Sequence, residues 1–91
     1  MFSIQDNKGF QISFKNGYTV SVQFGGGNYC ANRGCPIDGQ PVPESVTAET
    51  ALMTADGFVR YQSDDVQGHM SPSAVAELIA YAEALPTYQK E

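Results

Sequence analysis

The stretch Phe10-Gln-Ile-Ser-Phe-Lys-Asn-Gly-Tyr-Thr-Val-Ser-Val-Gln-Phe24 predicts the architecture of this 91-residue chain. Apolar and polar residues alternate on both sides of its central turn, as expected for two half-buried strands. A two-residue Asn-Gly turn would place Phe14 beside Thr19 and divide the apolar residues between two faces. A three-residue loop, Lys15-Asn16-Gly17, pairs Phe14 with Tyr18 and brings every large apolar residue to one face. We therefore predict the three-residue loop, because a slip by one residue would move a whole apolar set across the sheet.

The preceding turn, Asn7-Lys8-Gly9, has the same form and predicts a second bulged loop of this kind. In that register Ile4 pairs with Ile12, and Phe2 pairs with Phe14. The N-terminal part of the chain is thus expected to form a three-stranded meander with one apolar face and one polar face.

Residues 44–54 fit either a helix or a strand, and their β-branched residues favour the strand. A second hairpin is predicted around Ala55-Asp56-Gly57, with Met53 opposite Val59. Residues 66–70 are expected to return as a short edge strand. These segments bring the predicted antiparallel sheet to four or five strands.

One helix is predicted at the C-terminal end of the chain. Ser71 is a good N-cap and Pro72 suits the first helical position. Apolar residues then follow one helical stripe, namely Val75, Leu78, Ile79, Ala82 and Leu85. Pro86 ends the helix, and Thr87–Glu91 is expected to be a frayed tail. The predicted fold is α+β, with an N-terminal three-stranded meander, a hairpin and this helix packed on one face of the sheet.

Composition indicates one domain over residues 1–91, with 42% hydrophobic residues and a net charge of −5. Neither sign of charge clusters, which argues against nucleic-acid binding, since that requires a basic patch. No apolar run is long enough to cross a membrane and no signal peptide is recognised. We expect a cytoplasmic protein with reduced thiols, and two cysteines are too few for a disulfide framework.

Residues 25–45 are predicted to form a long Gly/Pro-rich loop, because they hold five of the nine glycines and three of the five prolines. Loops of this length in small domains are usually functional or disordered. Tyr and Arg side chains dominate the energetics of protein interfaces. The expected partner-binding residues are therefore those of this loop: Asn28, Tyr29, Asn32, Arg33, Ile37 and Gln40.

Other chemistry finds little support in the sequence. Cys30 and Cys35, with His69, could contribute to a zinc site, but the spacing is wide and the second ligand pair is missing. Gly25-Gly26-Gly27 and Arg33 could contact an anion, although no phosphate-loop motif follows the glycines. No nucleophile and base are paired in the sequence. We expect no enzymatic activity, no metal and no cofactor.

Several segments resemble small hypothetical proteins of bacteriophages and prophages. They are Phe2-Ser-Ile-Gln-Asp-Asn-Lys-Gly-Phe10, Phe14-Lys-Asn-Gly-Tyr-Thr-Val-Ser-Val-Gln-Phe-Gly-Gly-Gly-Asn-Tyr-Cys30, Ala48-Glu-Thr-Ala-Leu52, Asp56-Gly-Phe58 and Gly68-His-Met-Ser-Pro72. The resemblance implies a small accessory protein in the cytoplasm of a bacterial host cell. Many such proteins bind and inhibit a host protein, including components of host defence.

Three hypotheses about function follow. The first is a non-enzymatic phage-type accessory protein that binds and inhibits a host protein through the 25–45 loop. The second is a protein that binds or sequesters a small molecule or nucleotide as a dimer, and the third is a zinc-stapled structural module. One helix covers about three strands, so leftover apolar surface also favours a homodimer or another partner.

Overall fold

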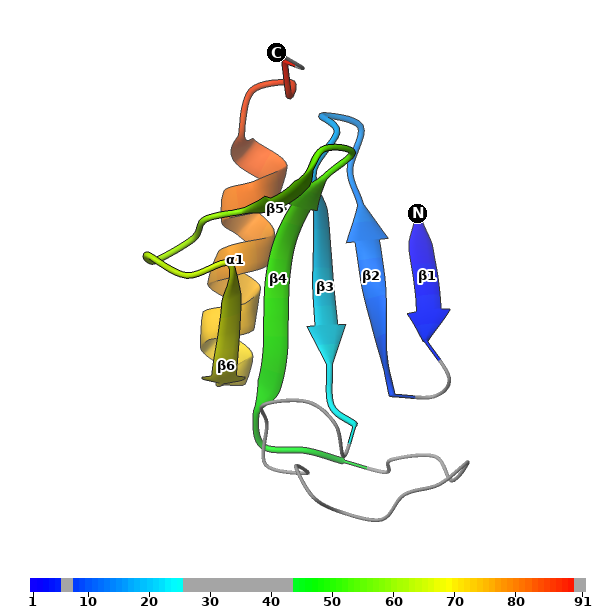
Figure 1. The fold of residues 1–91 in the computed structure, drawn as a ribbon. Helices are drawn as coiled ribbons and strands as arrows, with labels where there is room; N and C mark the ends of the chain where they lie inside the picture. The colour runs from blue at the N-terminus through cyan, green and yellow to red at the C-terminus, as the bar shows by residue number, and fades with distance from the viewer. Residues whose placement is uncertain (6–7, 26–43, 90–91) are drawn as a thin grey trace.

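A computed structural model describes residues 1–5, 8–25 and 44–89, which form an antiparallel sheet with a helix on one face (Figure 1). The strands are β1 (Phe2–Gln5), β2 (Gly9–Ser13), β3 (Thr19–Gln23), β4 (Ala48–Thr54), β5 (Gly57–Val59) and β6 (Val66–Met70), and the helix is α1 (Pro72–Ala84). The predicted α+β class is confirmed. The described sheet has six strands, one more than the largest number that we expected.

Strand β4 pairs with three other strands, β3, β5 and β6. Strand β3 pairs along one of its edges, and the order from the N-terminal side is β1-β2-β3-β4-β5. Strand β6 also pairs with β4, from Ala48 opposite Met70 to Ala51 opposite Val66, so β5 and β6 share the other edge. The strand expected within residues 44–54 is therefore confirmed as β4, and the expected edge strand is β6.

The β2–β3 hairpin has the predicted register. Phe10 lies opposite Val22, and Ile12 lies opposite Val20. The backbone N–H of Phe14 donates to the carbonyl of Tyr18 at 2.9 Å, which closes the three-residue loop. Gly17 has a φ of +92°, the left-handed conformation that this loop requires.

The predicted register of the first turn is wrong by two residues. Phe2 lies opposite Ile12 and Ile4 lies opposite Phe10, so the apolar residues still share one face. The reason is Gly9, which belongs to β2 rather than to the turn. A Cβ on Gly9 would collide with the carbonyl oxygen of Val22 and lie 2.8 Å from the Cα of the next residue in β3. The missing side chain thus allows β2 to approach β3 closely.

The predicted register of the second hairpin is also wrong, by one residue. Leu52 lies opposite Val59, and Met53 lies opposite Phe58, across a two-residue turn. Pairing with β3 sets the orientation of β4, because Leu52 lies opposite Val20 and is fully buried. Met53 consequently points to the other face, and Val59 joins Leu52 at the core.

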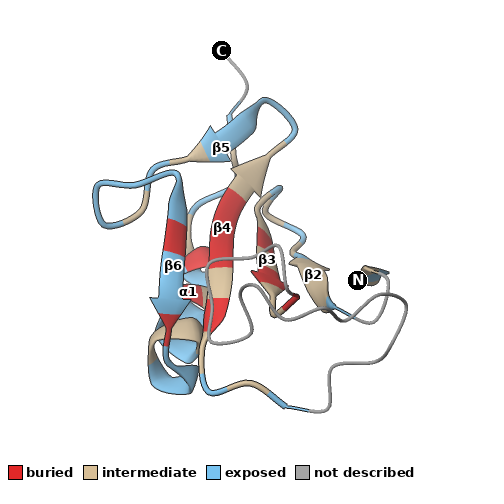
Figure 2. Cartoon of the chain, turned by 60° about the horizontal axis from the view of Figure 1, so that its bottom comes forward, coloured by how far each residue is buried: buried red, intermediate tan, exposed pale blue. Residues whose placement is uncertain are grey.

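Helix α1 begins as predicted. The Ser71 hydroxyl accepts a hydrogen bond from the Ala74 N–H at 3.1 Å, and Pro72 occupies the first turn. Leu78 and Ala82 are fully buried, which confirms the apolar stripe. The helix packs on β3, β4 and β6, where the buried residues of the sheet are concentrated (Figure 2). Helix α1 therefore does not extend over β1 and β2.

The segment after α1 is anchored by Tyr88, so the expectation of a frayed tail is wrong at this residue. The Tyr88 N–H donates to the Asn16 carbonyl at 2.7 Å, and its hydroxyl donates to Asp56 at 2.7 Å. Its ring packs edge-on against Tyr18 with centroids 5.7 Å apart. One aromatic residue thus joins the chain end to two hairpin turns.

Candidate partner-binding surface

The side chains predicted to bind a partner all lie outside the described residues: Asn28, Tyr29, Asn32, Arg33, Ile37 and Gln40. Cys30 and Cys35 lie outside them as well. Both ends of the predicted loop are described, since Phe24 and Gly25 follow β3 and residues 44–47 precede β4. These two ends border an apolar groove.

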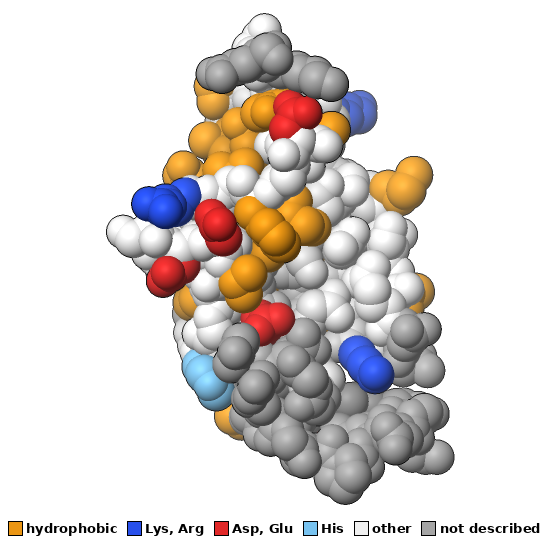
Figure 3. Space-filling model, viewed as in Figure 1, with side chains coloured by type: hydrophobic (Ala, Val, Ile, Leu, Met, Phe, Trp, Pro, Cys, Tyr) orange, Lys and Arg blue, Asp and Glu red, His pale blue; other side chains and the backbone are white. Residues whose placement is uncertain are grey.

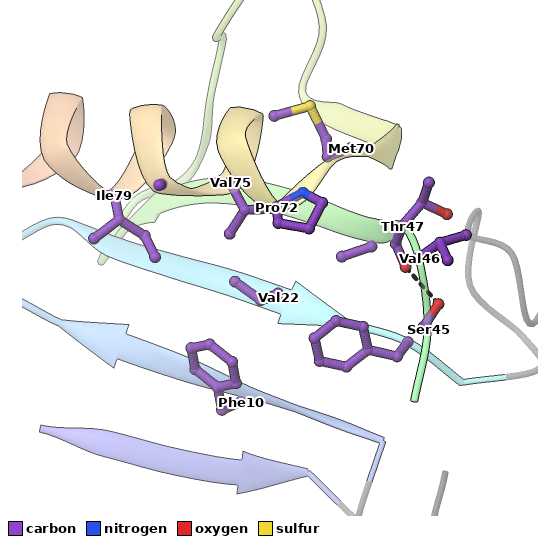
Figure 4. Close-up of a pocket in the computed structure, with 12 residues that line it drawn as sticks. Phe10, Val22, Ser45, Val46, Thr47, Met70, Pro72, Val75 and Ile79 are labelled. Atoms are coloured by element: carbon purple, nitrogen blue, oxygen red, sulfur yellow. Dashed lines mark hydrogen bonds between the residues drawn. The ribbon is translucent and has the colours of Figure 1, made fainter. Parts of the chain in front are cut away.

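The apolar groove has a volume of about 410 Å³ and lies between the N-terminal half of α1 and the sheet (Figure 4). Pro72, Val75 and Ile79 project from the helix toward Val22 and Phe10 on the strands (Figure 4). The remaining lining residues come from the loop ends, β4, β6 and α1: Phe24, Ser45, Val46, Thr47, Ala48, Met70 and Ala76.

The chain entering β4 forms one rim of the groove. The Ser45 hydroxyl donates to the Thr47 carbonyl at 2.6 Å and holds the intervening residue in a bend. Val46, at this bend, is 74% exposed. A large aliphatic side chain is therefore presented to solvent at the mouth of an apolar cavity.

The electrostatic character of the groove is neutral. No described residue that lines it carries a charge, and its polar side chains are the hydroxyls of Ser45 and Thr47. The Ser45 hydroxyl is already used in the bend. Such a surface offers a ligand apolar contact area rather than ion pairs.

The apolar surface continues from the groove to β1. Phe10 lines the groove and also packs against Phe2, with ring centroids 6.2 Å apart in an edge-to-face arrangement. Phe2 and Ile4 are 71% and 79% exposed. We call these two side chains the apolar edge. It is the leftover apolar surface that one helix on a wide sheet leads us to expect.

Comparison with known proteins gives no further guide. No protein-family model, curated protein or solved structure matches the chain. The candidate surface therefore rests on its geometry. No helix in the described ranges combines the length and apolar character that a membrane crossing requires.

The residues considered for catalysis or metal binding are not brought together in the described part of the chain. His69 is exposed and adopts a φ of +51° at an irregularity of the β4–β6 pairing. The hydroxyl of nearby Ser71 caps α1. No group of three or more His, Cys, Asp or Glu residues that could hold a metal occurs among the described residues.

The buried polar residues have a structural role. Gln67 donates from its side-chain amide to the carbonyls of Tyr61 and Asp64 at 2.9 and 2.7 Å, and accepts from the Thr50 hydroxyl at 3.2 Å. Every buried side-chain nitrogen or oxygen in the described ranges has a hydrogen-bond partner. This network fixes the turn between β5 and β6 and leaves no group aimed at a ligand.

The sheet face opposite α1 is mostly polar, with a small hydrophobic group near its middle (Figure 3). Its side chains bond to each other: the Gln23 amide reaches Gln5 at 2.8 Å, and the hydroxyls of Ser13 and Thr19 are 3.0 Å apart. Because Gly9 has no side chain, the Gln23 side chain can cross β2 and reach β1. This face is therefore a less suitable binding surface than the groove.

Sequence reasoning missed the groove because its walls come from four separate parts of the chain. One signal was present, since Phe24 and Val46 are large apolar residues at the two ends of the predicted loop. Their position suggests that the base of that loop contributes to binding, as well as its interior.

Proposed function

We propose that this protein is a non-enzymatic, phage-type accessory protein that binds and inhibits a host protein in the bacterial cytoplasm. The observation that carries the binding role is the apolar groove, which both ends of the predicted 25–45 loop border. The phage origin and the inhibition of a host-defence component rest on the resemblance of the sequence. The groove is the part of the described surface to which we assign partner contact.

The shape and chemistry of the groove favour a protein partner. Protein interfaces gain most of their affinity from a few large side chains inserted into desolvated pockets. The groove is open, apolar and rimmed by Val46, which is itself exposed. A partner that inserts an aliphatic or aromatic side chain would bury the cavity walls and Val46 together. Because none of the described residues that line the groove is charged, we expect the affinity to depend weakly on salt.

The test compares two matched surface variants. Val46→Asp places a charge at the mouth of the groove. The control, Phe58→Asp, places a charge on the opposite face of the sheet, at a residue that is 59% exposed. Affinity capture from host lysate, read by mass spectrometry, should recover one partner with the wild type and with Phe58→Asp. Val46→Asp should lose it, with at least tenfold weaker binding of the purified partner by calorimetry. Equal capture by both variants would contradict the groove assignment.

The loop itself is tested separately. Replacing residues 28–38 with a Gly/Ser linker of equal length leaves the groove residues unchanged. If the loop residues supply contacts as predicted, this variant also loses the partner while its circular dichroism spectrum is retained. Retained capture would remove the loop interior from the binding site and leave the groove as its main element.

A small apolar ligand is the second candidate function. Its support is the groove volume of about 410 Å³, which falls within the roughly 300–1,000 Å³ typical of small-molecule sites. The described lining of the groove offers an anion no cationic side chain, so a nucleotide would depend on Arg33, outside the described residues. A thermal-shift panel should therefore show stabilisation by aliphatic or aromatic compounds and not by nucleotides.

A homodimer, the other partner expected from the sequence, remains compatible with either role. The apolar edge on β1 and the mouth of the groove at Val46 are formed by different residues, so the two contacts can be disrupted by separate substitutions.

A further inference from the structure

The outer edge of β1 has a defined pattern of backbone hydrogen bonding. The amino group of Met1 donates to the Ser13 carbonyl at 3.0 Å, and the Ser13 N–H donates to the Met1 carbonyl at 2.9 Å. These two residues therefore form a hydrogen-bonded pair. Such pairs alternate along an antiparallel ladder, so Ser3 and Gln5 also point their backbone groups toward β2. Phe2 and Ile4 consequently point theirs away from β2.

The same two residues carry the apolar edge. Phe2 and Ile4 are 71% and 79% exposed, on the face of the sheet where α1 lies, yet α1 packs on β3, β4 and β6. No described strand pairs with the outer edge of β1. Outward-facing backbone groups and exposed apolar side chains therefore coincide at Phe2 and Ile4. Native proteins usually protect such an edge with charge, proline or a bulge.

We propose that β1 pairs antiparallel with β1 of a second copy of the chain, about a twofold axis at Ser3. In this register Phe2 of one copy lies opposite Ile4 of the other, and each such pair exchanges backbone hydrogen bonds. Facing residues lie on the same side of the sheet, so the apolar edge of each copy continues that of the other. Ser3 faces Ser3 of the second copy on the polar side.

The neighbouring registers fit less well. A twofold axis at Phe2 leaves Ile4 beyond the end of the partner strand. A twofold axis at Ile4 leaves Phe2 beyond the end of the partner strand. Only the axis at Ser3 uses the outward backbone groups of both residues while it matches apolar with apolar side chains.

The charge distribution favours a second copy. The chain carries a net charge of −5, so two copies repel wherever their acidic surfaces meet. Every described acidic residue lies at position 44 or later, on or beside β4 to α1. Strand β1, Phe2-Ser-Ile-Gln5, is uncharged. A symmetric contact through β1 therefore joins the copies at the side of the sheet farthest from β4 in strand order.

The first test measures mass in solution, using the full chain without an N-terminal tag. Light scattering after size exclusion over a concentration series should show the wild type approaching the mass of two chains. Ile4→Pro removes an outward N–H together with the exposed aliphatic side chain, without removing a bond to β2, and Ile4→Lys adds a charge at the edge; both should remain monomeric with an unchanged circular dichroism spectrum. Phe58→Lys, on the opposite face, should dimerise like the wild type. A wild type that is monomeric throughout the series overturns the proposal.

The second test reads the register directly. Ser3→Cys is made in a background with Cys30→Ser and Cys35→Ser, so that the new thiol is the only one. Facing residues that do not exchange hydrogen bonds have Cα atoms about 4.5 Å apart, within the roughly 4.4–6.8 Å range of disulfides. Mild oxidation should link most chains as dimers. Gln11→Cys, one strand further in, lies about 14 Å from its counterpart and should stay unlinked. Equal linking of the two variants, or none at Ser3→Cys, overturns the proposed pairing.

Discussion

Asn16 joins the β2–β3 turn to the C-terminal end of α1, and its replacement by alanine tests how much this connection stabilises the fold. Its side-chain amide donates to the carbonyls of Ala82 and Leu85 at 2.8 and 3.0 Å, and its Oδ1 accepts from the Tyr18 N–H at 3.1 Å. At about 0.5–1.5 kcal/mol per bond, their loss costs roughly 1.5–4.5 kcal/mol. Water can replace part of each bond at this partly buried site, so we expect Asn16→Ala to lower the unfolding free energy by about 2 kcal/mol.

Urea denaturation followed by circular dichroism measures this change. For a domain of this size, a loss of about 2 kcal/mol also lowers the melting temperature by roughly 8–16 °C. Lys15→Ala is the matched control, because Lys15 is the exposed neighbour in the same turn. We expect that control to stay within about 0.5 kcal/mol of the wild type.

A second variant tests the hydrogen bonds that the Asn16 amide donates to the C-terminal end of α1. Asn16→Asp keeps an oxygen for the Tyr18 N–H but loses every bond that the Asn16 amide donates and places a negative charge against the negative end of the α1 dipole. At neutral pH it should be at least as unstable as Asn16→Ala. The reasoning is refuted if Asn16→Ala matches Lys15→Ala, or if Asn16→Asp matches the wild type.

Two backbone positions give further predictions. Gly9→Ala should lose about 1–3 kcal/mol in urea denaturation, because its Cβ collides with the carbonyl of Val22; stability equal to the wild type would show that β2 and β3 are less closely apposed. His69→Gly should instead gain about 0.5–1 kcal/mol, since relief of about 1–2 kcal/mol of left-handed strain exceeds the entropic cost of glycine. A lower melting temperature for His69→Gly would contradict this explanation.

The apolar face of the sheet was predictable because alternation constrains it strongly. A slip by one residue at Lys15-Asn16-Gly17 would have exposed a whole set of apolar side chains, so the pattern selected the register that the structure shows. The first turn lacked such a constraint. A shift by two residues preserves the faces, and the sequence alone does not distinguish a turn glycine from one that permits close strand approach, as Gly9 does.

The candidate binding surface was only partly predictable, for a different reason. The limited reach of one helix over the sheet indicated leftover apolar surface, and Phe2 and Ile4 now show where part of it lies. The groove required the relative positions of α1, β3 and the segment before β4, which no local pattern encodes. The residues predicted inside the 25–45 loop remain a prediction.

The connection between β3 and β4 has a consequence for the evolution of this protein. Gln23 lies opposite Glu49, so the sheet is continuous across the two ends of that connection. The entropic cost of closing a loop grows slowly, by about 0.6 kcal/mol for each doubling of its length. Insertions, deletions and substitutions between these strands should therefore be tolerated by the scaffold. Natural variation can therefore diversify this segment while selection on folding acts on the sheet and α1.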